Sequence, residues 1–153
     1  MDIRLVNPFV EGLAGVFQAA LGLTPRRCAL RLESAGENGA VLTSFVSISG
    51  HVRGVVVLRL PPTTALRLVD RLRGTTSEEI DDDVIDAVAQ IISMIADAAK
   101  TRLSCVPPLE LGLPTVVHGR DYDMRYPTQS ARLELPFDSD VGRFTMELAF
   151  GSS

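Results

Sequence analysis

The strongest pattern in the sequence is a long apolar stripe between residues 82 and 104. Hydrophobic residues recur there every three or four positions, which is the spacing of one face of an α-helix. The stripe consists of Val84, Ile85, Val88, Ile91, Ile92, Ile95, Ala98, Ala99 and Leu103. At a rise of about 1.5 Å per residue the predicted helix is about 33 Å long, so its apolar face has to pack against a second layer of structure.

The other segments divide the chain into two halves with the same order of elements. Residues Asn7 to Leu21 have helical periodicity, with Asn7 as the predicted N-cap and Pro8 as the first helical residue. Three strand-like runs follow this helix, and three more follow the long helix. The predicted strands are 28–33, 39–49, 54–60, 109–117, 131–136 and 143–150. Between the halves, residues 63–72 predict a short helix that Gly74 closes.

Similarities between the halves indicate a duplicated unit. A proline break follows the first helix of each half, at residues 24–25 and at residues 107–108. The segment Gly54 to Leu60 is echoed by Gly142 to Leu148. Strands joined by short turns pair antiparallel, and helices have to cover the apolar side of the sheet. We therefore predict an α+β fold, a two-layer α/β sandwich with a six-stranded, mostly antiparallel sheet, long helices and an internal helix-β-β-β repeat.

Composition and charge are those of one folded domain spanning residues 1–153. Hydrophobic residues make up 46% and charged residues 22% of the chain, unlike the composition of disordered proteins. With a net charge of -4 and clustered arginines only at residues 26–27 and 67–73, we do not expect nucleic acid as a partner. Charge-free apolar stretches reach only about 10 residues, whereas a membrane span takes about 20. The N-terminus also lacks the pattern of a secretory signal, so we expect a cytoplasmic protein without a membrane partner.

A line of polar residues runs along the other side of the long predicted helix. Successive members are 4, 3, 4 and 3 residues apart, so all of them lie on one face, opposite the apolar stripe. They are Asp86, Gln90, Ser93, Asp97 and Lys100. Small residues beside this line would let another backbone approach closely, which suits a docking surface. An ordinary solvated helix face would show the same spacing.

Other polar groups carry weaker signals. The run Asp81 to Asp83 resembles a cation site, but acidic side chains also stabilise a helix N-terminus, and three consecutive residues cannot all point at one ion. Cys28 and Cys105 lack the spacing of a metal site, so we expect reduced thiols and no bound metal. His51 and His118 are expected in turns between strands. No hydrolase, dinucleotide or nucleotide-phosphate motif accompanies them.

Four segments carry a family resemblance: Asn7–Glu11, Ile48–Leu58, Asp86–Lys100 and Gly112–Val116. Together they resemble the chemotaxis phosphatases of the CheC and CheX family, and the CheX branch most of all. The likeness covers about residues 3–150, and the segment in the long helix is its most specific part. It implies a six-stranded sheet flanked by long helices, and dephosphorylation of the response regulator CheY.

The resemblance also implies a function for the polar face of the long helix. In the family this helix carries a Glu-x-x-Asn motif, in which the glutamate pairs with a receiver-domain lysine and the asparagine orients the attacking water. Here Gln90 and Ser93 occupy these two positions, so both motif residues differ. Ser93 is shorter than asparagine and tends to bond back to the carbonyl of Ala89. Gln90 has the length of a glutamate without the charge that pairs with a lysine.

Alternatives exist for the missing groups. Asp86 or Asp97, one helical turn to either side, could supply the charge, and the amide of Gln90 could itself position water. The first predicted helix offers Glu11 and Ala14 at its equivalent face, a Glu-x-x-Ala pair that also lacks the amide.

Two functions therefore remain open at the level of sequence. The first is a phosphatase that docks a phosphorylated CheY-type receiver domain through the five polar residues, with Gln90 and Ser93 at the catalytic positions. The second is a non-catalytic receiver-binding or flagellar-switch-like adaptor, which the loss of both motif residues favours. The resemblance to CheX-like proteins also implies a homodimer formed through sheet edges, with which exposed edge strands would agree. We also expect no cofactor of its own, because the partner receiver domain would hold the Mg2+.

Overall fold

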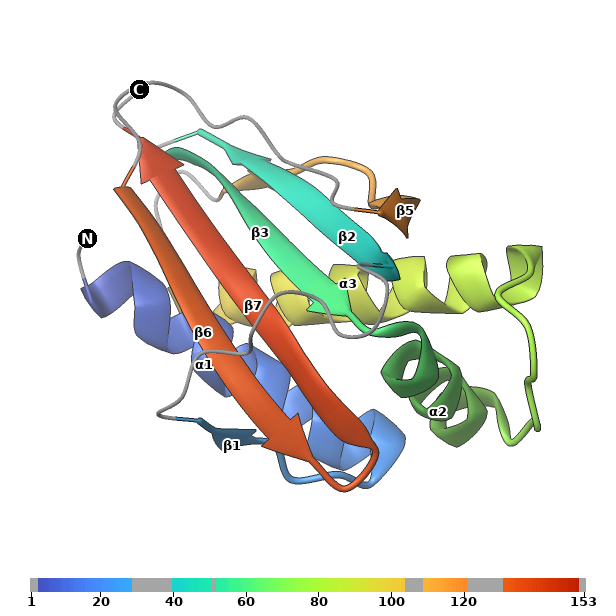
Figure 1. Ribbon diagram of the computed structural model, residues 1–153. Helices are drawn as coiled ribbons and strands as arrows, with labels where there is room; N and C mark the ends of the chain where they lie inside the picture. The colour runs from blue at the N-terminus through green and yellow to red at the C-terminus, as the bar shows by residue number, and fades with distance from the viewer. Residues whose placement is uncertain (1–2, 29–39, 51, 104–108, 121–130, 152–153) are drawn as a thin grey trace.

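The computed structural model describes residues 3–28, 40–50, 52–103, 109–120 and 131–151. An antiparallel sheet faces the viewer in Figure 1, and the helices α1 (Ile3–Val16) and α3 (Asp82–Leu103) lie behind it. A third helix, α2 (Pro62–Arg73), packs near one end of the sheet. The predicted two-layer α+β architecture is confirmed.

The described part of the sheet contains seven strands, where the sequence predicted six. They are β1 (Arg26–Arg27), β2 (Ala40–Ser49), β3 (Arg53–Leu60), β4 (Glu110–Leu111), β5 (Thr115–Arg120), β6 (Ala131–Ser139) and β7 (Gly142–Gly151). The predicted strand 109–117 is wrong as a single strand, because it is interrupted between β4 and β5. Pro114 lies in this break and has no N–H to donate to a ladder, while the N–H of Gly112 donates to the carbonyl of Ser47 at 2.8 Å. The first predicted strand, 28–33, does not coincide with β1, which ends at Arg27, before the predicted start; Cys28 lies outside the strand, and residues 29–33 lie outside the described residues.

The order of the strands interlocks the two halves of the chain. The path β1-β6-β7-β3-β2 ends at β5 and β4, which both pair with β2. Without β4, the strand order is β1-β6-β7-β3-β2-β5. Exchanging β1 with β5, β2 with β6 and β3 with β7 gives the same order read from the other edge. The sheet is therefore symmetric about the central β3–β7 pair. Leu58 of β3 pairs with Met146 of β7 at this centre. These two residues hold the same place in the echoed segments Gly54–Leu60 and Gly142–Leu148, so the topology supports the predicted internal repeat.

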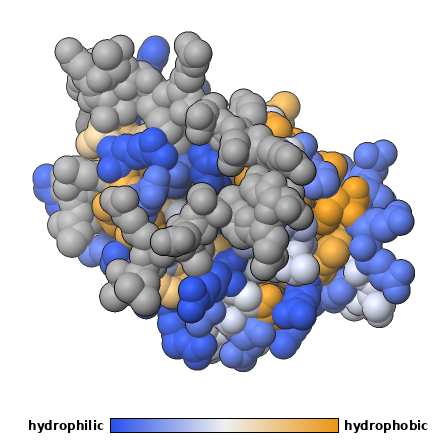
Figure 2. Space-filling view, in the orientation of Figure 1, coloured by the Kyte–Doolittle hydropathy of each residue, from blue (hydrophilic) through white to orange (hydrophobic). Residues whose placement is uncertain are grey.

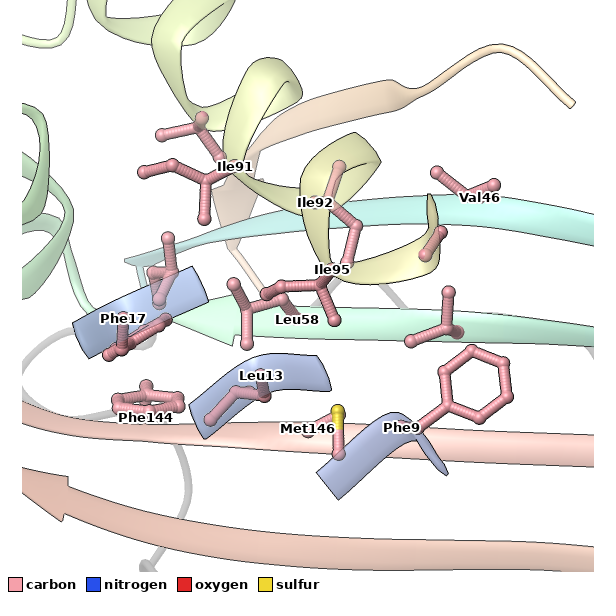
Figure 3. Close-up of a cluster of buried hydrophobic side chains, with 14 of the residues drawn as sticks. Phe9, Leu13, Phe17, Val46, Leu58, Ile91, Ile92, Ile95, Phe144 and Met146 are labelled. Carbon is pink, nitrogen blue, oxygen red and sulfur yellow. The ribbon is translucent and has the colours of Figure 1, made fainter. Parts of the chain in front are cut away.

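The core lies between the sheet and the two long helices (Figure 3). Leu13 of α1 and Ile95 of α3 are fully buried against the central strands. The ring of Phe17 packs on Phe144 of β7, with 5.0 Å between the ring centroids. Burial of each side chain of this size stabilises the fold by about 1.5–3 kcal/mol. The apolar stripe predicted for α3 is thus confirmed as its core-facing side.

Helix α1 starts earlier than predicted. It begins at Ile3 and contains Pro8, so the prediction of Asn7 as N-cap and Pro8 as first residue is wrong. Proline is tolerated here because its missing N–H and its ring affect only the carbonyl of Arg4, in the first turn of the helix. A π-helical turn, η1 (Phe17–Leu21), continues α1 to the predicted end.

The connection between α2 and α3 is held by two aspartates. Gly74 ends α2 as predicted, with φ of 66° and its N–H donating to the carbonyl of Asp70. The carboxylate of Asp70 accepts hydrogen bonds from the N–H of Ser77 at 2.7 Å and from the hydroxyl of Thr75 at 3.0 Å. Desolvation raises the pKa of the Asp70 carboxyl, but these hydrogen bonds outweigh it and hold the pKa below its usual value. At the other end of the connection, Oδ1 of Asp81 accepts from the N–H of Val84 at 3.0 Å, so Asp81 caps α3.

Candidate functional site

The five polar residues predicted to share a face of α3 lie on the side that points away from the core. Asp86, Gln90 and Asp97 are exposed, and Ser93 and Lys100 are half-buried. From Asp86 to Lys100 the face is about 21 Å long, at about 1.5 Å per residue. A surface of this length on one rigid helix can be covered by a single protein partner.

Gln90 and Ser93 lie at the middle of this face, and their side chains are available to a partner. Within the described residues neither side chain makes a hydrogen bond. The expected bond from Ser93 back to the carbonyl of Ala89 is therefore not formed in this conformation. By contrast, the hydroxyl of Thr101, two turns later, does bond back to the carbonyl of Asp97 at 3.1 Å. The centre of the face thus presents an amide and a free hydroxyl.

Helix α1 lies against α3 and runs in the opposite direction (Figures 1 and 3). Glycine permits their close contact, because a Cβ on Gly12 would lie only 3.1 Å from the amide nitrogen of Ala99. Glu11 and Ala14 are exposed on α1. The Glu-x-x-Ala pair predicted on the equivalent face is therefore accessible, beside the face of α3.

A guanidinium spans the junction of these two helices. Nη1 of Arg102 donates to the carbonyl of Ala98 at 3.1 Å, and a Cβ on Gly15 would lie 3.3 Å from Nη2. Sequence reasoning missed this arrangement. The sequence does contain a signal for it, the glycines Gly12 and Gly15 inside the first helix. Glycine inside a helix lowers stability, so two of them three residues apart indicate that another group packs closely against the helix there.

The N-terminal end of α3 is acidic. Asp82 and Asp83 are exposed in the first turn, where they interact favourably with the helix dipole, and Asp81 is occupied as the cap. Hydrophilic residues cover the right-hand margin of the view in Figure 2, where the α2–α3 connection lies. Across the described ranges no three His, Cys, Asp or Glu side chains gather closely enough to hold a metal ion.

Among the described residues, the remaining candidates make no hydrogen bond or ion pair with this face. His118 is exposed on β5, inside a strand and not in the predicted turn. Cys28 is a half-buried free thiol. His51 and Cys105 lie outside the described residues. None of the helices in the described ranges is long and apolar enough to span a membrane.

The other side of the sheet holds an ion cluster around a buried carboxylate, which sequence analysis missed. Glu147 of β7 has a side chain only 3% exposed, and its carboxylate lies 3.1 Å from Nε of Arg59 and 3.0 Å from Nη2 of Arg132. Its neighbour Met146 points into the helix-facing core, so Glu147 points the opposite way. The cluster joins β3, β7 and β6 and is not part of the α3 face. Residues so far apart in the chain give no local signal of such pairing.

The fold and this face together define a class of protein: a pseudo-symmetric α+β sandwich with an exposed polar face on the outer side of one long helix. Residues 42–138, more than half of the chain, match the family Chemotaxis phosphatase CheX. The chain therefore belongs to the CheX family of chemotaxis phosphatases.

Individual relatives agree with this assignment. The chain is 24% identical to the CheY-P phosphatase CheX of Thermotoga maritima over 127 residues, which cover 82% of each protein. Its fold is similar to the crystal structure of the chemotaxis protein CheX from Vibrio vulnificus, with a TM-score of 0.84, 21% identity, and coverage of 99% of this chain and 100% of that one. It is also similar to a chain of the CheX-CheY-BeF3-Mg2+ complex from Borrelia burgdorferi, with a TM-score of 0.76, 18% identity, and coverage of 97% and 99%.

Proposed function

We propose that this protein binds a phosphorylated CheY-type receiver domain through the outer face of α3 and accelerates loss of its phosphoryl group. The partner-binding residues are Asp86, Gln90, Ser93, Asp97 and Lys100. The observation that carries the proposal is the exposed, unbonded amide of Gln90 at the centre of this face. Membership of the CheX family supports the phosphatase activity, and the CheX-CheY complex from Borrelia burgdorferi supports the kind of partner.

The proposed reaction requires only one main contribution from the phosphatase, the positioning of a water molecule. In a receiver domain the bound Mg2+ neutralises charge on the aspartyl phosphate, so the proposed reaction requires no metal from this protein. Hydrolysis then needs a water placed in line with the bond between phosphorus and the aspartyl oxygen. The water oxygen forms a new bond to phosphorus, the aspartyl carboxylate leaves with the electron pair, and inorganic phosphate departs.

Gln90 is the group on α3 that can hold this water. It is the single side-chain amide in the sequence of α3, and an amide both donates and accepts hydrogen bonds. The hydroxyl of Ser93, three residues further along the same face, would make a second contact with the water or the phosphoryl oxygens. Gln90 carries no charge, so Asp86 and Asp97 are the residues that would attract a basic group of the receiver.

The test is the decay rate of phosphorylated CheY, measured with and without stoichiometric protein. We expect the wild type to accelerate decay, and the Gln90→Glu, Ser93→Asn variant, which carries the family motif, to accelerate it further. The control is the Gln90→Arg, Ser93→Arg variant, which should not bind the receiver yet should retain the wild-type fold by circular dichroism. Unchanged binding by the arginine variant would refute the α3 docking face.

The second function, a non-catalytic receiver-binding or switch-like adaptor, is favoured by one observation. Neither motif position holds its family residue, and the hydroxyl of Ser93 is shorter than an asparagine amide. The same decay experiment separates the two functions. Acceleration by the Gln90→Glu, Ser93→Asn variant alone would identify a binding protein on a phosphatase scaffold.

A homodimer formed through sheet edges is part of the proposal. Among the described strands β5 pairs with β2 alone, and we propose that its other edge pairs with the same edge of a second copy. Light scattering tests this directly, since a monomeric mass at micromolar concentration would contradict it.

A further inference from the structure

Two different polar groups flank Gln90 on the outer face of α3. Asp86 precedes it by four residues and Ser93 follows it by three, so each lies about one helical turn from the amide on the same face. Within the described part of the chain, the exposed carboxylate of Asp86 makes no hydrogen bond and no ion pair. A carboxylate only accepts hydrogen bonds, whereas a serine hydroxyl also donates one. Gln90 therefore has an acceptor on its N-terminal side and a donor on its C-terminal side.

The attacking water needs acceptors. A lone pair of its oxygen points at phosphorus, so its two O–H groups have to be held by other atoms. The amide oxygen of Gln90 can accept from one O–H, and the other O–H requires a second acceptor. The phosphoryl oxygens themselves only accept hydrogen bonds, so the hydroxyl of Ser93 suits them as a donor and the carboxylate of Asp86 does not. Of the two neighbours of Gln90, Asp86 is thus the one that suits the water.

The spacing of Asp86 and Gln90 also fits a shared water. Residues four apart on a helix have their Cβ atoms about 6 Å from each other. Two acceptors that share one water stand about 4.5 Å apart, because each of the two hydrogen bonds is about 2.8 Å long. Side chains on a helix lean toward its N-terminus, so the long side chain of Gln90 extends toward the turn that carries Asp86. Ala87 and Ala89 flank the pair with only a methyl group each.

The other carboxylates of α3 are too far from Gln90 to share its water. Asp83 lies seven residues before Gln90 and Asp97 lies seven residues after it, which is about 10.5 Å along the helix axis in each case. Asp82 is one residue further away than Asp83. Asp86 is therefore the one carboxylate of α3 within about a turn of the amide.

We propose that Asp86 is a second catalytic residue, whose carboxylate accepts one O–H of the attacking water while the amide oxygen of Gln90 accepts the other. This inference rests on the proposed function. As the water oxygen bonds to phosphorus, one of its protons passes to Asp86, and the electron pair of the breaking P–O bond goes to the aspartate of the receiver. The departing phosphate takes this proton back and leaves as dihydrogen phosphate with both hydrogens of the water, so the carboxylate of Asp86 is restored. Asp97 keeps the role of attracting a basic group.

Two measurements separate this role from simple attraction of a charged partner. One is the decay rate of phosphorylated CheY at saturating concentrations of the protein. The other is the affinity for a CheY-type receiver activated with beryllofluoride and Mg2+, measured by isothermal titration calorimetry. We expect Asp86→Asn to lower the saturating rate by about tenfold or more, because it removes the proton acceptor, and to leave the affinity within about threefold of wild type. Asp86→Glu keeps a carboxylate and should recover most of the rate.

The matched control is Asp83→Asn, the same substitution at an exposed aspartate three residues earlier on α3. It should leave the rate and the affinity within about twofold of wild type, and all variants should melt at similar temperatures. Weaker binding by Asp86→Asn with an unchanged saturating rate would overturn the inference, because Asp86 would then only attract the partner. If Gln90→Ala loses the acceleration and Asp86→Asn keeps it, only the role of Asp86 is refuted. If the wild type does not accelerate decay, the proposed function fails and this inference fails with it.

Discussion

The two sides of α3 differ in what they contact, and therefore in what a substitution can change. On the inner side Val88, Ile91 and Ile95 are 0% exposed and pack against the sheet and α1. On the outer side Asp86 and Gln90 are exposed. Stability depends on the first side and the proposed partner on the second. The comparison predicts that substitutions on one helix fall into two separable groups.

The largest effect is expected from the centre of the inner side. Ile95→Ala removes fully buried carbon atoms and leaves a cavity, so the free energy of unfolding should fall by about 2–5 kcal/mol. Urea denaturation measures it. Ile85→Ala, at the half-buried margin of the same stripe, is the control and should cost less. Equal losses at both positions would contradict the contrast between a packed centre and a solvated margin.

The next effect is expected where α1 crosses α3. Gly12→Val places side-chain atoms where a Cβ alone lies 3.1 Å from the amide nitrogen of Ala99, so the helices must separate. The expected loss in the free energy of unfolding is about 1–3 kcal/mol. Ala14→Val on the exposed side of α1 introduces the same β-branched residue without the junction. It should cost only about 0.7 kcal/mol or less, the difference in helix propensity.

A smaller effect is expected at the start of α3. Asp81→Ala removes the acceptor of the Val84 N–H and should lower stability by about 1 kcal/mol. Thermal melting followed by circular dichroism would measure it. Asp82→Ala loses only the interaction with the helix dipole and should cost less. A greater loss at Asp82 would show that the capping hydrogen bond is not what stabilises this end.

Local patterns were sufficient to predict α3 and the fold class. The apolar repeat of α3 coincides with its buried side, and the predicted start at Asp82 and the closing Gly74 of α2 are as observed. The prediction was wrong at Pro8, because a proline can stand either at the start of a helix or within its first turns. Pro8 was interpreted as a helix start, but a proline in the second turn costs only one hydrogen bond.

Long-range pairing could not be predicted from single residues. The pairing of β1 with β6 and of β5 with β2 joins opposite halves of the chain. The ion pair of the buried Glu147 with Arg59 depends on this sheet order, and no local pattern contains it. The polar face of α3 was predicted because helical spacing is local. The position of Arg102 over Gly15 was not, because it depends on how α1 crosses α3.

The smallest effect on stability, and the sharpest test of the comparison, is expected at Gln90. Its side chain is exposed and makes no hydrogen bond within the described residues, so Gln90→Ala should change the free energy of unfolding by less than about 0.5 kcal/mol. The same variant should lose most of the acceleration of CheY-P decay, because it removes the amide proposed to hold the water.

Ile95→Val is the matched opposite, since it should lower stability by about 0.5–1.5 kcal/mol and leave the decay rate at the wild-type value. Both variants are measured by urea denaturation and by the decay assay on the same preparations. If Gln90→Ala destabilises the protein, or Ile95→Val slows decay in fully folded protein, the two sides of α3 are coupled. Independent effects would mean that the helix keeps its packing and its chemistry on separate sides, as its burial pattern implies.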